Sequence, residues 1–188
     1  MPLWGATDSD ESKPKHLTTA QKKEVFANAS GWVVEAGSTQ SGNGNTSADP
    51  EILVAIGGLA SSIGAADITE IEFITTAFDK SDGGTLQVRV RFNEAVDVSG
   101  TPQLTVVNDT NSNHTLSYAS GTGTNEFVFS LTIAAGNAAT DAGDVLSIGT
   151  NAMALNSGTV KDAGTSDNAT ITNSSAIGTA AGTITVSA

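Results

Sequence analysis

The sequence predicts a mainly β fold, an antiparallel β-sandwich preceded by a small N-terminal segment with one short helix and one or two strands. Apolar and polar residues alternate cleanly over residues 85–92, and residues 125–133 repeat the pattern, which is typical of half-buried antiparallel strands. Turns rich in Gly, Asn and Asp recur about every ten residues, with no helical periodicity between them, as in a sandwich with Greek-key connections. The inward side chains would be Leu86, Val88, Val90 and Phe92 on the first strand, and Phe127, Phe129, Leu131 and Ile133 on the second.

The N-terminal segment contains the one helix that the sequence predicts. Thr18 and Gln21 fit a capping box, in which each side chain binds a backbone N–H at the start of a helix. The helix is expected over residues 19–27, too short to be stable without packing against other elements. A strand over residues 31–36, a polar loop over 37–49 and an apolar strand over 51–56 are expected to follow.

The remaining expected strands are short. Together with the two alternating strands they bring the predicted sandwich to seven or eight strands. They are expected at residues 71–76, 103–107, 115–120, 145–148, 169–172 and 183–186.

The charge of the chain lies mostly in its second part. Eight Lys and Arg stand against 20 Asp and Glu, a net charge of -12. Residues 1–50 hold four lysines and six acids, whereas residues 51–188 hold four cations and fourteen acids. Such an acidic excess argues against nucleic acid and anionic membranes as partners, since both are bound through Lys and Arg. The change in composition places a boundary near residue 66, between an N-terminal anchoring or oligomerisation segment (residues 1–66) and the sandwich (residues 67–188).

The N-terminus predicts no secretory signal, and the absence of cysteine excludes disulfides and thiolate chemistry. The acidic turn at residues 79–84 has glycine at the sixth position of a calcium-binding EF-hand loop, but Val90 occupies the twelfth, where a glutamate is required. The turn is therefore interpreted as a simple connection between strands, and no metal or cofactor is predicted. A looser calcium site built from several loops stays open, with candidates Asp141, Asp144, Asp162 and Asp167.

No set of catalytic residues stands out, and the chain is predicted not to be an enzyme. A nucleophilic triad would need His16 or His114, which are both expected in exposed loops. Arg89 and Arg91 lie on the outward face of one strand, where cross-strand pairing with Asp or Glu is the expected role and an acidic partner is the alternative.

Three motifs resemble bacterial Ig-like repeats, which occur in large surface and adhesion proteins. They are VRFNEAVDVSGTPQLTV at residues 90–106, YASGTGTN at 118–125 and ALNSGTVKDA at 154–163. The resemblance covers residues 67–176 and implies that the predicted sandwich is Ig-like.

The start of the chain resembles small virion structural proteins of marine tailed phages, particularly cyanophages. The matching motifs are PLWG at residues 2–5, SKPKHL at 12–17, VFA at 25–27 and GWV at 31–33. The resemblance implies a capsid decoration protein on the virion surface, bound to the major capsid protein or another virion protein as a homo-oligomer, with a trimer favoured. The predicted anchor residues are Trp4, Val25, Phe26 and Trp32, with the run at residues 52–56 as a further candidate contact.

Two alternatives remain open at this point. Trp4 and Trp32 could instead close a small N-terminal core with neighbouring apolar side chains. The chain could also be a carbohydrate- or host-surface-binding module of a phage tail or bacterial surface. That function calls for a strip of exposed aromatic side chains, for which Tyr118 is a single candidate.

Overall fold

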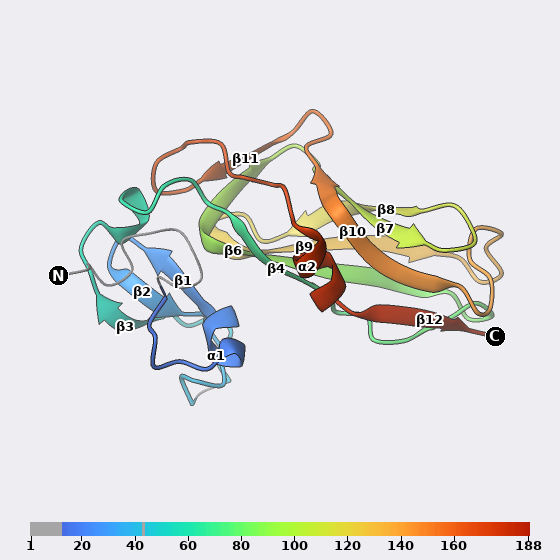
Figure 1. Cartoon of the computed structure of the whole chain (residues 1–188), viewed down its shortest axis with the longest axis horizontal. Helices are drawn as coiled ribbons and strands as arrows, with labels where there is room; N and C mark the ends of the chain where they lie inside the picture. Colours follow the sequence, from blue (N-terminus) through green and yellow to red (C-terminus); the bar gives the residue numbers. More distant parts are fainter. Residues whose placement is uncertain (1–12, 43) are drawn as a thin grey trace.

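The computed structural model describes residues 13–42 and 44–188, and the chain is mainly β (Figure 1). We call residues 13–66 the N-terminal unit and residues 67–188 the sandwich. The N-terminal unit contains α1 (Thr19–Lys23), β1 (Val25–Asn28), β2 (Gly31–Val34), β3 (Glu51–Ala55) and the 3-10 helix η2 (Leu59–Ser61). Among the described residues, no helix is both long and apolar enough to cross a membrane.

The sandwich contains nine strands and one short helix. They are β4 (Ile68–Phe73), β5 (Phe78–Asp79), β6 (Gly84–Ser99), β7 (Gln103–Asn108), β8 (His114–Ser120), β9 (Thr124–Ile133), β10 (Val145–Ala154), β11 (Thr159–Asp162), α2 (Ser175–Ala180) and β12 (Thr183–Ser187). The strand order is β3-β2-β1-β6-β9-β8-β7-β10-β12-β5, with β4 and β11 also paired to β6.

The alternating strands pack as their pattern predicts. Leu86, Val88, Val90 and Phe92 of β6 are all buried, and Phe127, Phe129 and Ile133 of β9 are buried opposite them while Leu131 is partly buried. The rings of Phe92 and Phe127 lie 5.0 Å apart between centroids, and Tyr118 meets Phe127 edge-on at 5.5 Å. These side chains share one hydrophobic cluster with residues of β7, β8, β10 and β12, which is the core of the sandwich.

The long strand β6 connects the two parts of the chain. Its first half pairs with β4 and β9, its last four residues pair with β11, and Glu94 pairs in parallel with Ala27 of β1. The three-stranded sheet of the N-terminal unit therefore continues into the sandwich through β1 and β6, as Figure 1 shows.

The predicted helix begins where the sequence indicates but is shorter than expected. Both hydrogen bonds of the capping box between Thr18 and Gln21 are present. The helix ends at Lys23 rather than Ala27, because residues 25–28 form β1 and pair with β2 from Val25↔Val34 to Asn28↔Gly31. Val25 is β-branched and Phe26 is aromatic, and both are buried in β1. Their burial stabilises the strand more than four further residues would stabilise the helix.

Other local predictions need correction. Residues 169–172 form no strand and make only an isolated bridge, Asp67↔Thr170. The helix α2 lies in a region where the sequence predicted strands alone. Its N-cap is Ser174, whose hydroxyl accepts a hydrogen bond from the Ile177 N–H at 3.3 Å. The strands β5 and β11 were also not predicted, since two and four residues are too few to show alternation.

Candidate functional site

Three of the four predicted anchor residues lie inside the N-terminal unit. Val25, Phe26 and Trp32 are buried, with 1% of Trp32 exposed, while Trp4 lies outside the described residues. The indole of Trp32 belongs to the hydrophobic cluster of Val25, Ala27, Trp32, Val34, Leu59 and Ile63. The buried position of Trp32 agrees with the alternative in which this residue closes a small core. A contact between this unit and a partner must therefore use other, exposed side chains.

The outer edge of this unit is the strand β3. It is the first strand in the sheet order, and its neighbour β2 pairs with it on one side. The approach of the two strands is close at Gly31, where φ is +139° and an added Cβ would lie 2.0 Å from the Val54 carbonyl oxygen. Val54 and Ile56 pack against the small core, so one face of β3 is covered.

The other side chains of β3 are exposed. A register shift between the pairs Trp32↔Val54 and Val33↔Ile52 leaves Leu53 as an extra residue in β3, a β-bulge. Ile52 is 56% exposed and Leu53 37% exposed, although successive side chains of a regular strand point to opposite faces. Among the described residues, the exposed large hydrophobic side chains are these two and Leu155, which lies on the sandwich between β10 and β11.

A sheet edge of this kind favours contact with another protein. Edge strands present unpaired backbone N–H and C=O groups, and natural proteins usually blunt them with charged side chains, prolines or bulges. In β3 the bulge is present, but residues 52–56 carry no charge. The candidate functional site is therefore the β3 edge, defined here as residues 51–56 with Ile52 and Leu53 at its centre.

A network of charged side chains joins the N-terminal unit to the sandwich. Arg91 on β6 lies at its centre, with the guanidinium Nη1 2.8 Å from Glu70 Oε2 and 3.1 Å from Glu72 Oε1. The Nε atom of Arg91 lies 2.7 Å from Glu126 Oε1 and 3.3 Å from Glu35 Oε1. The predicted cross-strand pairing of the arginines is thus confirmed, because Glu72 and Glu126 also contact Arg89.

Glu35 is the member of this network that comes from the N-terminal unit. Its Oε1 accepts a hydrogen bond from Asn125 Nδ2 at 2.7 Å, so it contacts both β6 and β9. The pKa of Glu35 is raised to about 7, first by burial and then by the nearby carboxylate of Glu126, while Arg91 and Asn125 act in the opposite direction. The same carboxylates raise the pKa of Arg91, which stays charged.

We expect the raised pKa of Glu35 to make the folded chain less stable at pH 8 than at pH 5. Between about pH 4.5 and pH 7 the Glu35 side chain is protonated in the folded chain but ionised in the unfolded chain. The stabilisation from this difference is complete below pH 4.5 and is lost as the pH rises through 7. The contribution is at most about 3 kcal/mol. Glu35→Gln keeps the hydrogen-bond acceptor but cannot titrate, so the difference in urea midpoint between wild type and this variant should grow from pH 5 to pH 8. An unchanged difference would contradict the assignment.

The candidate calcium ligands are used within turns. The pKa of Asp144 is lowered because its carboxylate accepts hydrogen bonds from the Asp141 N–H, then from the Thr110 hydroxyl and the Asn108 amide. Asp141 pairs with Lys80. Asp162 Oδ1 accepts from two backbone N–H groups of its own turn, and the Asp167 carbonyl accepts from the Asp162 N–H. No group of three or more metal-binding side chains occurs among the described residues.

The two histidines occupy different surroundings. His16 lies in an exposed turn as predicted, but the prediction for His114 was wrong: it is buried in β8, with Nε2 3.2 Å from the Thr140 hydroxyl. Burial lowers the pKa of His114. The two histidines lie on different elements, His16 in the turn before α1 and His114 in β8.

The charged network and the β3 edge differ in how far the sequence indicated them. The sequence placed residues 52–56 as an apolar run and both arginines on one outward face. It gave no signal that Glu35, which precedes Arg91 by 56 residues, would reach this arginine, since that contact depends on the pairing of β1 with β6. Comparison with protein-family models, curated proteins and solved structures finds no match to this chain.

Proposed function

We propose that this chain is a non-enzymatic phage virion structural protein, a capsid decoration protein that binds the shell through its N-terminal unit and displays the Ig-like sandwich. The resemblance of residues 2–33 to small virion proteins supports the role, and the β3 edge supplies a surface suited to it. The proposed partner is the major capsid protein or another virion protein.

The observation that carries the proposal is the exposure of Ile52 and Leu53 on an edge strand whose residues 52–55 carry no charge, in an acidic protein. A partner strand beside β3 would satisfy its free backbone groups and cover both side chains. The sandwich holds 13 acids and four cations, and so nine of the twelve excess negative charges; it would face solvent and keep crowded copies apart. Many copies acting together would give stable attachment from a modest contact.

A homo-oligomer, with a trimer favoured, is the proposed form on the shell. An edge contact between different surfaces of neighbouring copies closes into a ring when the rotation between copies allows it. A ring at a local threefold axis of the shell would match the symmetry of the partner.

Leu53→Lys is expected to reduce the amount of this protein on purified virions to less than a tenth of the wild-type amount. A lysine on the edge strand would bring a charge into the contact and oppose strand pairing. The matched control is Leu155→Lys, because Leu155 is 40% exposed, close to the 37% of Leu53, but lies on the sandwich. The measurement is quantitative mass spectrometry of purified particles, with circular dichroism to confirm that both variants fold.

Equal occupancy of the wild type and Leu53→Lys would show that the β3 edge is not the contact. This substitution is a better test than deletion of residues 1–35. That deletion removes β1 and β2 with Val25 and Trp32, and so would unfold the small core whatever its partner.

A carbohydrate- or host-surface-binding module is the second function considered. It calls for a flat exposed aromatic ring, but Tyr118 packs edge-on against Phe127 and Phe129 and its hydroxyl accepts a hydrogen bond from the Thr122 N–H. No described side chain thus favours this alternative. Glycan-array binding that survives Leu53→Lys would support it over the virion role.

A further inference from the structure

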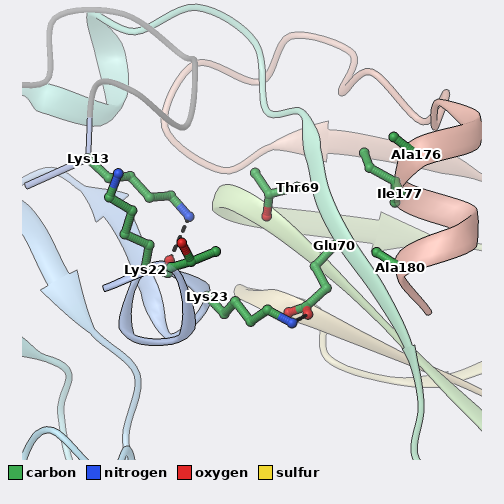
Figure 2. A pocket seen from close by; sticks show the side chains of 9 residues that line it. Lys13, Lys22, Lys23, Thr69, Glu70, Ala176, Ile177 and Ala180 are labelled. Atoms are coloured by element: carbon green, nitrogen blue, oxygen red, sulfur yellow. Dashed lines mark hydrogen bonds and ion pairs between the residues drawn. The ribbon is translucent and has the colours of Figure 1, made fainter. Parts of the chain in front are cut away.

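A hollow of about 270 Å³ lies between the two helices of the chain, where the N-terminal unit meets the sandwich (Figure 2). Its α1 side carries Lys13, Lys22 and Lys23, and β4 contributes Thr69 and Glu70. The α2 side is apolar, formed by Ala176, Ile177 and Ala180. Figure 2 shows the lysines and the apolar side chains on opposite sides of the hollow.

The lining is the most cationic place in an acidic molecule. Three of the eight Lys and Arg residues of the whole chain line it. Glu70 is the carboxylate among the described lining residues, and it already pairs with both Lys23 and Arg91. Cations therefore outnumber carboxylates among the described residues that line the hollow, although the chain as a whole has a net charge of -12.

The three lysines differ in the hydrogen bonds and ion pairs that their ammonium groups make. Lys13 is 2% exposed, and its ammonium donates a hydrogen bond to the Lys22 carbonyl at 2.9 Å. The ammonium of Lys23 is fixed by Glu70. Lys22 makes no hydrogen bond or ion pair through its side chain with any residue in the described ranges, so its ammonium is available to a ligand.

We propose that this hollow binds a carboxylate side chain from an acidic segment of another protein molecule. Lys22, supported by the field of Lys13 and Lys23, would pair with the carboxylate, and the methylene groups of the ligand would contact Ile177 and its neighbours on α2. This inference does not depend on the virion role proposed above, because it concerns a different surface from the β3 edge.

Size and chemistry favour a carboxylate over larger anions. Sites for drug-sized ligands and cofactors occupy about 300–1,000 Å³, and this hollow lies just below that range. The described lining residues include lysines but no arginine, and the planar guanidinium of arginine is the group that best suits phosphate. A lysine of the hollow, Lys23, already binds the carboxylate of Glu70. The apolar wall matches the stem of a Glu or Asp side chain better than a phosphate, which has no apolar part.

The test is a titration of the full chain with the blocked peptide acetyl-Gly-Glu-Gly-amide, followed by backbone amide chemical shifts. We expect saturable shifts at Thr19, Thr69 and Ile177 that weaken with added salt, and none with the matched peptide acetyl-Gly-Gln-Gly-amide. Lys22→Gln should lower the affinity at least fivefold. Lys161→Gln removes the same charge from β11, which is not among the described elements that line the hollow, and should leave the affinity unchanged.

Three outcomes would overturn the proposal. Absence of saturable shifts in the wild type would show that the hollow is not a site. Equal or tighter binding of inorganic phosphate would make it a general anion site. Asp8, Asp10 and Glu11 lie just before Lys13 in the sequence, so peptide binding only after Asp8→Asn, Asp10→Asn and Glu11→Gln would identify the chain's own carboxylates as the ligand.

Discussion

Arg91→Met is expected to lower the free energy of unfolding by about 3–5 kcal/mol, because loss of one partner leaves buried charges uncompensated. Arg91 is buried and is the shared partner of four carboxylates, which come from β4, from β9 and from the residue that follows β2. Methionine keeps much of the volume of the side chain but none of its charge or hydrogen bonds. The remaining carboxylates would then repel one another at the junction between the N-terminal unit and the sandwich.

The matched control for this substitution is Arg89→Met on the same strand. Arg89 contacts Glu72 and Glu126, but its side chain is 29% exposed, against 9% for Arg91, so its ion pairs are largely screened by solvent. We expect Arg89→Met to cost no more than about 1 kcal/mol. Urea denaturation at pH 7 measures both changes.

A second variant keeps the prediction testable if Arg91→Met does not fold. Addition of Glu70→Gln and Glu126→Gln removes two of the carboxylates that Arg91 compensates, and should recover a large part of the lost stability. Equal costs for Arg89→Met and Arg91→Met, or no recovery in the triple variant, would show that the network is not organised around Arg91.

The sequence was sufficient to predict the sandwich because its strands are amphipathic. The inward positions from Leu86 to Phe92 in β6 and from Phe127 to Ile133 in β9 are all apolar, and five of the six residues between them are polar, so the local pattern and the final burial coincide there. The outward face of β6 carries both arginines for the same reason, and their cross-strand partners follow from antiparallel pairing.

The limits of prediction lie where burial depends on distant parts of the chain. Val25 and Phe26 continue a helical segment in sequence, yet they form β1, because β2 and β6 offer partners on both sides of that strand. His114 is flanked by polar residues that suggest a loop, but the strand β8 begins there and the side chain is buried. Pairing between strands decides both cases, and a single sequence does not reveal it.

The candidate sites, like the fold, could be predicted from the sequence only in part. The β3 edge lies in a short apolar run that the sequence reveals, but its exposure depends on the bulge at Leu53 and on which strand ends the sheet. The lysine-lined hollow depends on the approach of α1 and α2, which are separated by about 150 residues and of which only α1 was predicted. Surfaces built from two distant elements are therefore the part of this molecule that required the structure.

Trp32→Ala separates a core role of this residue from a role in partner contact. Removal of a buried tryptophan side chain costs about 3–5 kcal/mol through lost burial and the cavity left behind. Trp32 lies in the small cluster of the N-terminal unit, whereas the sandwich has a separate hydrophobic cluster that extends from Ala66 to Val186. We therefore expect β1 and β2 to lose protection from amide hydrogen exchange in this variant, while β6 and β9 keep it.

Trp32→Phe is the control for the same position. Trp32 Nε1 has no hydrogen-bond partner among the described residues, so phenylalanine retains an aromatic ring in the core without loss of a hydrogen bond. This variant should keep the exchange protection of β1 and, under the proposed virion role, the occupancy of the protein on virions, whereas Trp32→Ala should lose both. If Trp32→Ala keeps full protection in β1 and still fails to join the virion, the indole contacts the partner directly. The buried position of Trp32 argues for the first result, because a side chain that is 1% exposed reaches a partner only after the unit opens.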